Sequence, residues 1–184
     1  MKKGLVLIAA LALAVPVLAQ PAAIDLGTLT SDTSVSGVLN PAEVVWYEFT
    51  IGDVAYIDIT TNDSTGVSDS ELGLYDDLGV FVATDDDDGF GLLSTLSFND
   101  GSGLALGDSW NLGGDGIANG EDGPLPAGTY YLAFGGYNTT YGMDNWDVTS
   151  TSSQEGDYTI TFYVPEPASL MLLGFAGLVA LRRR

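Results

Sequence analysis

The 184-residue sequence contains no cysteine and no histidine, and it has only 5 lysine or arginine residues against 25 acidic ones. Without these two residue types, the chain cannot form a Ser-His-Asp or Cys-His nucleophilic site, a thiolate or imidazole zinc site, a haem site with an axial histidine, or a disulfide. The length suits a single domain with short additional segments.

The basic residues all lie at the two ends of the chain: Lys2 and Lys3 at the start, and Arg182, Arg183 and Arg184 at the end. The body between them, residues 20–164, carries 24 acidic residues, all of the 25 except Glu166. Nucleic acid is therefore excluded as a partner, because its binding depends on Lys and Arg neutralising phosphates. An anionic membrane surface would repel the body for the same reason.

Residues 1–19 have the pattern of a signal peptide. A basic start precedes the apolar stretch 5–18, and Val17 and Ala19 are small residues that suit signal peptidase cleavage before Gln20. The alternative is a retained membrane helix, but the apolar run is shorter than the roughly 20 residues that span a bilayer. We therefore expect signal peptidase to cleave the exported chain, which would then begin at Gln20.

The C-terminal segment, residues 165–184, combines three features in order. Pro165-Glu166-Pro167 is followed by the apolar stretch 168–181 and then by the arginines Arg182–Arg184. This arrangement resembles the PEP-CTERM sorting signal of exported Gram-negative proteins. The resemblance implies a short membrane helix that anchors the chain transiently in the inner membrane. It also implies cleavage near the triplet by a membrane-embedded exosortase, which releases the body to the cell surface or extracellular matrix.

The apolar stretch 168–181 is short for a membrane span. Fourteen helical residues extend roughly 21 Å, less than the roughly 30 Å hydrocarbon core, so the anchor is marginal and relies on snorkelling arginines. The positive-inside rule places both basic clusters in the cytoplasm and the acidic body outside it. A buried C-terminal helix is the alternative, which the three terminal arginines and the pair Gly174 and Gly177 disfavour.

The body is predicted to be all-β. It holds 21 of the 24 glycines and shows no long stretch of helical periodicity. Alternating apolar residues in 45–51 and 55–60, on either side of Gly52-Asp53, predict a β-hairpin. Further strands are expected at 24–29, 71–75, 80–84, 92–98, 129–134 and 157–164. A total of about seven to nine short strands favours an antiparallel β-sandwich or jelly roll.

Several motifs in the body resemble the bacterial pre-peptidase C-terminal (PPC) domain. They are Asp69-Ser70-Glu71-Leu72-Gly73-Leu74-Tyr75-Asp76 with Gly79, Ala83-Thr84-Asp85-Asp86-Asp87, the segment 125–132, and Gly156-Asp157-Tyr158-Thr159-Ile160. The resemblance implies a compact β-sandwich module that binds or spaces without catalysis, often with a structural calcium ion. A Gly/Asp-rich insertion between Asn99 and Pro124 departs from the pattern.

The densest charge run consists of four consecutive aspartates, Asp85, Asp86, Asp87 and Asp88. Adjacent carboxylates without a basic neighbour repel one another, and a hard divalent cation relieves this repulsion. Ca²⁺ takes six to eight oxygen ligands in a flexible geometry, so we predict a Ca²⁺ site here, with Asp69 or Glu71 as a ligand from a neighbouring loop. The spacing does not fit an EF-hand. The alternative is a solvated acidic loop.

Aromatic residues among amide and carboxylate side chains form another candidate site: Trp110, Tyr137, Tyr141 and Trp146. Such residues suit the faces and hydroxyls of a polysaccharide, although the rings can equally pack against the core. We therefore expect a non-enzymatic structural or binding protein associated with exopolysaccharide or biofilm, with a carbohydrate-binding module as the alternative. A glycoside hydrolase needs only two carboxylates, but no pair stands out among the 24 in the body.

Overall fold

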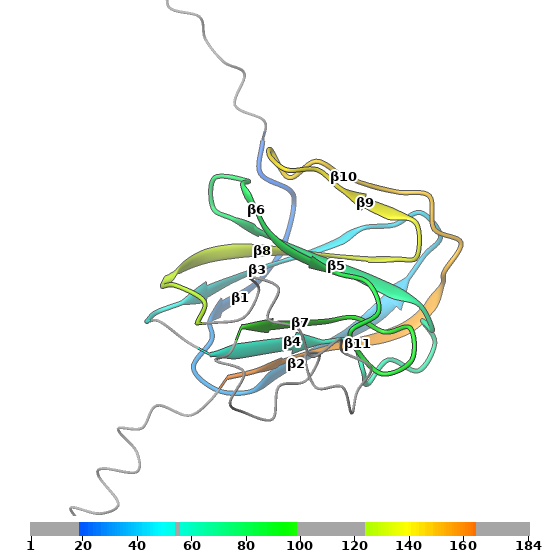
Figure 1. The fold of residues 1–184 in the computed structure, drawn as a ribbon, viewed down its shortest axis with the longest axis horizontal. Helices are drawn as coiled ribbons and strands as arrows, with labels where there is room; N and C mark the ends of the chain where they lie inside the picture. Colours follow the sequence, from blue (N-terminus) through cyan, green and yellow to red (C-terminus); the bar gives the residue numbers. More distant parts are fainter. Residues whose placement is uncertain (1–18, 54–55, 99–123, 165–184) are drawn as a thin grey trace, which may run out of the picture.

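The computed structural model describes residues 19–53, 56–98 and 124–164, and within these ranges eleven strands form two main β-sheets and a hairpin (Figure 1). The five-stranded sheet contains, in spatial order, β1 (Ile24–Thr28), β3 (Val45–Ile51), β8 (Gly128–Gly136), β5 (Ser70–Asp76) and β6 (Phe81–Asp85). The four-stranded sheet contains β2 (Thr33–Leu39), β11 (Gly156–Tyr163), β4 (Ile57–Thr60) and β7 (Thr95–Phe98). The hairpin consists of β9 (Thr139–Tyr141) and β10 (Val148–Ser150).

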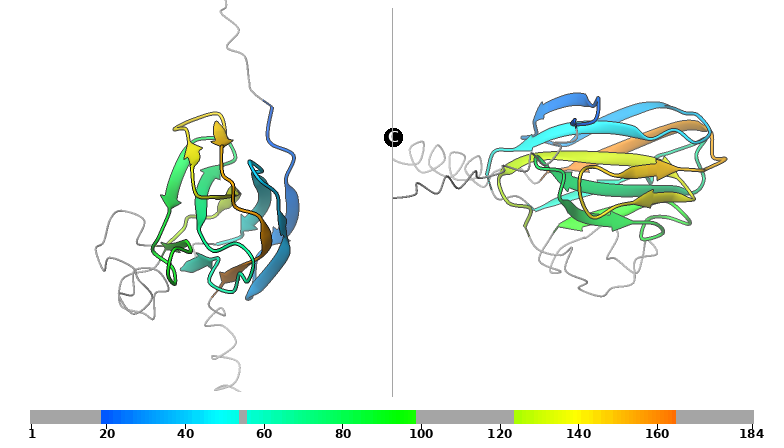
Figure 2. Two further views of the ribbon diagram at one scale, coloured as in Figure 1. Left: turned by 90° about the vertical axis from the view of Figure 1, so that its right-hand side faces the viewer. Right: turned by 90° about the horizontal axis from the view of Figure 1, so that it is seen from above.

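The two main sheets pack face to face, which confirms the predicted β-sandwich (Figure 2). Phe49 of β3 and Phe162 of β11 are fully buried between the layers, with ring centroids 5.2 Å apart. The hydroxyl oxygens of Tyr47 and Tyr158 lie 2.7 Å apart, so a buried hydrogen bond also joins the two sheets. Apolar packing therefore holds this part of the core, and the tyrosine pair adds a polar link across it.

The predicted hairpin of residues 45–51 and 55–60 is wrong. β3 pairs with β1 and β8, whereas β4 pairs with β11 and β7, so the chain crosses from one sheet to the other between them. Phe49 and Ile59 are both fully buried in the same core. The alternation of apolar and polar residues identifies the buried face of each strand. It does not show whether two strands pair in one sheet or face each other across the core, because both arrangements give the same alternation.

Two further details of the predicted architecture need correction. The described ranges contain eleven strands where seven to nine were expected, because β2, β9 and β10 were missed. β2 has the sequence TSVSGVL, with a central glycine, and β9 and β10 have only three residues each. The sandwich is also not wholly antiparallel, since β1 pairs with β3 in parallel, with Ile24 opposite Tyr47. The alternation of side chains is the same in parallel and antiparallel strands, so it could not predict this pairing.

The β9–β10 hairpin lies on the side of the five-stranded sheet that faces away from the four-stranded sheet (Figure 1). This second cover explains why both faces of the central strand β8 are buried: Leu132 faces the core, while Tyr131 and Ala133 face the opposite side and are also buried. The body therefore has three layers over part of its area.

The predicted signal peptide and C-terminal membrane helix lie outside the described residues, as does the insertion from Asn99 to 123. Within the ranges that the structure describes, no helix has the length and apolar character needed to cross a membrane.

Candidate metal centre

Three carboxylates from two neighbouring segments meet at one end of the sandwich. Asp69 comes directly before β5, and Asp86 and Asp87 come directly after β6. Because β5 and β6 are antiparallel, with Leu72 opposite Asp85, the start of one strand lies beside the end of the other. One oxygen from each of the three carboxylates lies within 4.8 Å of the others. This group, called here the acidic triad, can bind a metal ion, and its oxygen-only donors suit a hard divalent cation.

The electrostatics of the acidic triad favour a bound cation. Burial raises the pKa of Asp69, and the neighbouring charges of Asp86 and Asp87 raise it further. Burial also raises the pKa of Asp86, with an additional contribution from Asp87. The described part of the chain contains no lysine or arginine that would neutralise these charges. A divalent cation among the three carboxylates would supply the missing positive charge.

Asp85 lies beside the acidic triad but has a different role. Its side chain is only 7% exposed, and its carboxylate accepts hydrogen bonds from the backbone N–H groups of Thr95, at 2.6 Å, and Asp88, at 3.3 Å. Burial raises the pKa of Asp85 to about 8, with the charge of Asp88 adding to the rise and the two backbone N–H groups opposing it. The prediction placed all four aspartates in one Ca²⁺ site, whereas the structure brings Asp86 and Asp87 to the triad and turns Asp85 inward.

Glu71 connects the triad to the β9–β10 hairpin. Its carboxylate, 8% exposed, accepts hydrogen bonds from the backbone N–H groups of Asn138 and Thr139, both at 3.0 Å. Asn138 lies in the turn between β8 and β9, and Thr139 is the first residue of β9. Burial raises the pKa of Glu71 to about 7, and the charges of Asp86 and Asp69 contribute to the rise. Glu71 therefore stabilises the start of the hairpin through these hydrogen bonds, and the charges of the triad act on its carboxyl group.

A buried network of hydroxyl groups fixes the backbone on which the triad stands. Ser94 Oγ donates to the carbonyl oxygen of Ser70 and lies 2.9 Å from the carbonyl oxygen of Asp86. The Ser94 N–H donates to the hydroxyls of Thr61, at 2.9 Å, and Ser70, at 3.0 Å. Thr61, Ser70 and Ser94 are all fully buried. Sequence reasoning missed this network, because isolated Ser and Thr residues are equally common on solvated loops.

Gly89, which ends the aspartate run, is required by packing. A Cβ atom at this position would lie 2.2 Å from the carbonyl oxygen of Leu93, and the Gly89 N–H donates to the same oxygen at 2.7 Å. Only glycine permits this approach of two backbone segments. The loop that carries Asp86 and Asp87 is thus closed against the segment before β7.

Two of the predicted sugar-binding rings pack on the outer face of the five-stranded sheet. The Tyr141 ring lies against Gly73, where an added Cβ would come within 2.1 Å of it, and the Trp146 ring lies over Gly79. Trp146 also contacts Tyr131 edge to face, with centroids 5.8 Å apart. Among the described residues, the buried Tyr141 hydroxyl and Trp146 Nε1 have no hydrogen-bond partner.

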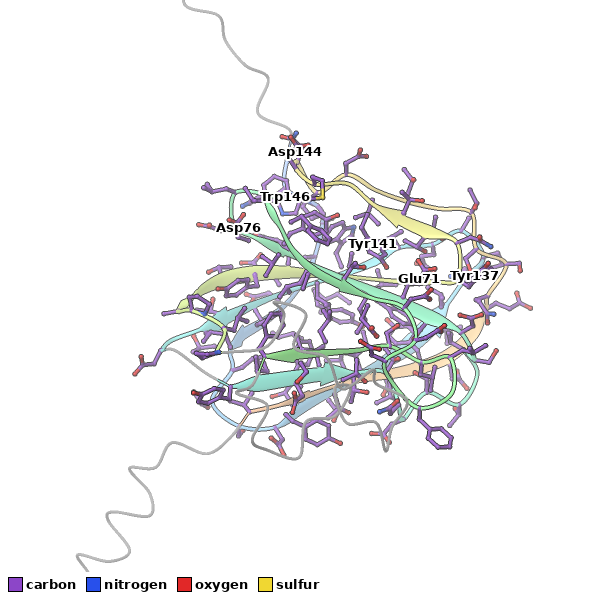
Figure 3. All side chains as sticks on the ribbon, in the orientation of Figure 1. Glu71, Asp76, Tyr137, Tyr141, Asp144 and Trp146 are labelled. Atoms are coloured by element: carbon purple, nitrogen blue, oxygen red, sulfur yellow. The ribbon has the colours of Figure 1, made fainter. Side chains whose placement is uncertain are left out.

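Figure 3 shows Tyr137 near Glu71 at one end of the hairpin, and Trp146 near the other. Tyr137 is 51% exposed and remains accessible to a ligand. Trp110 lies outside the described residues.

The predicted processing residues fall at the limits of the described chain. Ala19 and Gln20 are exposed. Pro165, Glu166, Pro167 and the three arginines lie beyond the last described residue, Val164. Val164 itself is buried, and its N–H donates to the Asp32 carboxylate at 2.9 Å.

These observations define an acidic β-sandwich with a centre of oxygen donors at one end. Residues 164–184 match the PEP-CTERM protein-sorting motif, as the C-terminal residues predicted. The motif implies that the protein is exported, sorted to the cell surface and processed by an exosortase.

Comparison with solved structures finds proteins similar in arrangement to the body. The pre-peptidase C-terminal domain of a collagenase from Bacillus anthracis has 14% sequence identity and a TM-score of 0.44, covering 78% of this chain and 98% of that domain. The Salmonella Typhimurium protein PliG, a periplasmic inhibitor of g-type lysozyme, has 11% identity and a TM-score of 0.37, covering 77% of this chain and 97% of its own. A search of curated proteins finds no match to the sequence.

Proposed function

We propose that this protein is an exported, non-enzymatic β-sandwich that is held transiently in the inner membrane, processed by an exosortase, and released to the cell surface or extracellular matrix. The observation that carries the proposal is the sorting motif at 164–184, which begins one residue after β11 ends at Tyr163. The folded body and the motif are therefore contiguous. Signal peptidase cleavage before Gln20 belongs to the same proposal.

A non-enzymatic role is supported by the positions of the two carboxyls whose pKa rises furthest into the neutral range. Asp85 and Glu71 are the acids that a glycosidase mechanism would draw on. Both are buried and accept backbone N–H groups that hold adjacent loops in place. These contacts give both carboxyls a structural role.

We also propose that the acidic triad binds Ca²⁺. The three donors are carboxylates from the segments before β5 and after β6. Ca²⁺ accepts carboxylates in a flexible geometry, whereas Mg²⁺ needs near-ideal octahedral geometry, so the group suits Ca²⁺ better. The hydroxyl network beneath the triad holds two of its segments together before any ion binds. Ca²⁺ would stabilise the folded body and would not take part in a reaction.

An association with extracellular polysaccharide completes the proposal. The body carries a large excess of carboxylates, and Ca²⁺ on such a surface can bridge to acidic sugars. A carbohydrate-binding module is the weaker alternative, because the Tyr141 and Trp146 rings pack against the sheet. Among the residues that the structure describes, this leaves Tyr137 as the exposed member of the predicted aromatic site.

The sorting proposal is tested by expressing the full chain in a Gram-negative host with and without a co-expressed exosortase. We expect a processed form that lacks residues 168–184 in the medium or surface fraction only when the enzyme is present. A variant with Arg182–Arg184 changed to Ala is the control for recognition. Intact-mass measurement of released protein that still carries the three arginines would contradict the proposal.

The Ca²⁺ proposal is tested by thermal unfolding of the body at constant ionic strength of about 0.15 M, where screening of surface charge is unchanged. Saturating Ca²⁺, at about 100 times its dissociation constant, adds roughly 2.7 kcal/mol to the free energy of unfolding, which raises Tm by roughly 5–10 °C. Mg²⁺ should raise it less.

The variant Asp86→Asn with Asp87→Asn should lose the Ca²⁺ response. The charge-matched control, Asp144→Asn with Glu155→Gln, changes exposed acids elsewhere and should keep the response. Equal Tm values in Ca²⁺ and in chelator would show that the triad is a solvated acidic loop.

A further inference from the structure

The last strand of the sandwich ends directly before the sorting motif. β11 lies between β2 and β4 in the four-stranded sheet, with Phe162 opposite Thr33 and Tyr163 opposite Asp58. Val164 directly follows β11, is 7% exposed, and donates its N–H to the Asp32 carboxylate at 2.9 Å. The fold therefore holds every residue up to the one that precedes Pro165.

The sequence leaves little distance between this point and the membrane. Three residues, Pro165-Glu166-Pro167, separate Val164 from the apolar stretch at 168, and three extended residues span at most about 11 Å. The polar headgroup region is about 5–7 Å thick on each side of the bilayer. The apolar stretch is also too short to cross the hydrocarbon core, so it holds its flanking residues close to the interface. While the chain is anchored, the end of the sandwich at Val164 lies against the lipid headgroups.

Charge at this end opposes any closer approach to the membrane. Asp32 accepts the Val164 N–H, and Asp58 of β4 pairs with Tyr163, so two acidic residues lie at the point where the chain leaves the body. The described residues offer no lysine or arginine to offset them. Anionic lipids repel such a surface. The short tether alone then keeps the body at the membrane.

We infer that this end of the sandwich is the surface that the processing enzyme must contact, and that the Asp32–Val164 hydrogen bond limits its access to the triplet. A membrane-embedded enzyme must take an extended segment around the triplet into its site. With Val164 buried and hydrogen-bonded to Asp32, only Pro165-Glu166-Pro167 lies between the folded body and the apolar stretch. Access therefore requires Val164 to leave its buried position, and Asp32 is the side chain that holds its N–H group.

This inference rests on the proposed processing by an exosortase, and it is tested by the rate of processing. The half-life of the anchored precursor is measured by pulse-chase labelling in cells that contain the enzyme. The first variant carries six Gly/Ser residues inserted between Val164 and Pro165, and its control carries the same insert between Ala22 and Ala23. The second variant is Asp32→Ala, and its control is Asp144→Ala, which changes an exposed acid on the β9–β10 hairpin.

We expect Asp32→Ala to shorten the precursor half-life by a factor on the order of five, which corresponds to the loss of one hydrogen bond. The spacer should shorten it at least as much, while both controls keep the parent half-life. The spacer variant leaves the Asp32–Val164 bond intact, so it tests the distance independently of whether Asp32→Ala folds.

Unchanged half-lives in both the spacer and Asp32→Ala variants, with the parent precursor processed normally, would overturn the inference and leave the proposed function standing. A parent precursor that persists unprocessed in the presence of the enzyme would overturn the proposed function, and this inference with it.

Discussion

The two ends of the sandwich are supported in different ways. At the end where β5 begins and β6 finishes, the acidic triad stands on buried hydroxyls of Ser70 and Ser94 and beside the buried carboxylates of Asp85 and Glu71. At the opposite end, where β11 finishes, the exposed side chain of Asp32 holds Val164. The end that gathers like charges has the larger set of buried polar contacts. Internal hydrogen bonds thus hold together loops that their own charges would push apart.

The acidic triad and the attachment point of the sorting motif lie at opposite ends of the sandwich. β11 starts near the triad, where the Gly66 N–H donates to the Asp157 carbonyl oxygen, and runs to the opposite end at Tyr163. In the proposed anchored form, a body tethered through Val164 would present its acidic triad away from the membrane. A cation or an acidic polysaccharide can reach the triad in the anchored and in the released protein alike.

The largest loss of stability is predicted for a substitution that overpacks the acidic end of the sandwich. Gly89→Ala places a Cβ 2.2 Å from the Leu93 carbonyl oxygen, so the two backbone segments must separate. We expect the free energy of unfolding to fall by about 3 kcal/mol and Tm to fall by roughly 10 °C. The control at the opposite end is Gly52→Ala, whose Cβ meets only Thr28 Cγ2 at 3.5 Å and should change stability by less than about 0.5 kcal/mol. Equal melting temperatures for the two variants would contradict the asymmetry.

A second prediction concerns pH. The pKa values of Asp85, about 8, and Glu71, about 7, are higher in the folded chain than the values near 4 expected when it is unfolded. Between these limits the folded state binds more protons, so stability falls as pH rises from about 4.5 to 8. Glu71 alone accounts for roughly 3 kcal/mol of this fall.

Thermal unfolding in chelator across this pH range checks the second prediction. Glu71→Gln, which removes one titrating carboxyl, should flatten the profile. A parent Tm that is constant from pH 5 to 8 would show that neither carboxyl carries a raised pKa in the folded protein.

A third prediction compares single polar contacts at the two ends. Ser94→Ala leaves the buried carbonyl oxygens of Ser70 and Asp86 without the Ser94 hydroxyl, and it should lower the free energy of unfolding by about 2 kcal/mol. Asp32→Ala removes one partly exposed hydrogen bond and should cost about 1 kcal/mol or less. Denaturant titration of both variants measures the two losses in the free energy of unfolding. A larger loss for Asp32→Ala would reverse the comparison.

The smallest change in stability is predicted for two tyrosine hydroxyls near the β9–β10 hairpin, which Glu71 links to the acidic end. Tyr75 Oη donates to the Gly142 carbonyl oxygen at 2.9 Å, so Tyr75→Phe should lower the free energy of unfolding by about 1 kcal/mol. The buried Tyr141 hydroxyl has no partner in the part of the chain that the structure describes, so Tyr141→Phe should be neutral or stabilising by up to about 1 kcal/mol. Matched chemical unfolding of the two variants checks this pair, and a loss in Tyr141→Phe would reveal a partner for that hydroxyl.

Much of the fold could be predicted from alternation of apolar residues. The strands β3, β5, β8 and β11 lie close to their predicted positions, because each places large apolar side chains in the core at every second residue. The pairing of strands could not be predicted in the same way. The crossing between β3 and β4 and the parallel pairing of β1 depend on where the connections lead, which side-chain alternation does not encode.

The candidate site was predicted in part. The structure brings Asp69 close to Asp86 and Asp87, since adjacent ends of antiparallel strands meet, and the assignment of Asp69 as a Ca²⁺ ligand stays a prediction. The inward position of Asp85 follows from β6, where Ala83 faces the core and the residue two positions later shares its face. The support from Ser70, Ser94 and Thr61 could not be found, because it joins the start of β5, the residue before β7 and the residue after β4, which are far apart in the sequence.

The central position of β11 has a consequence for the time the chain takes to fold. β11 is the last strand, yet its Gly156 pairs with Leu39, 117 residues earlier, and its Phe162 pairs with Thr33. Pairings between such distant residues raise the contact order, and β-sandwiches dominated by them fold in milliseconds to seconds. The four-stranded sheet cannot close until Tyr163 has left the ribosome and crossed the membrane. The body is therefore a late-folding domain, whose sheet is completed by the same strand that leads into the sorting motif.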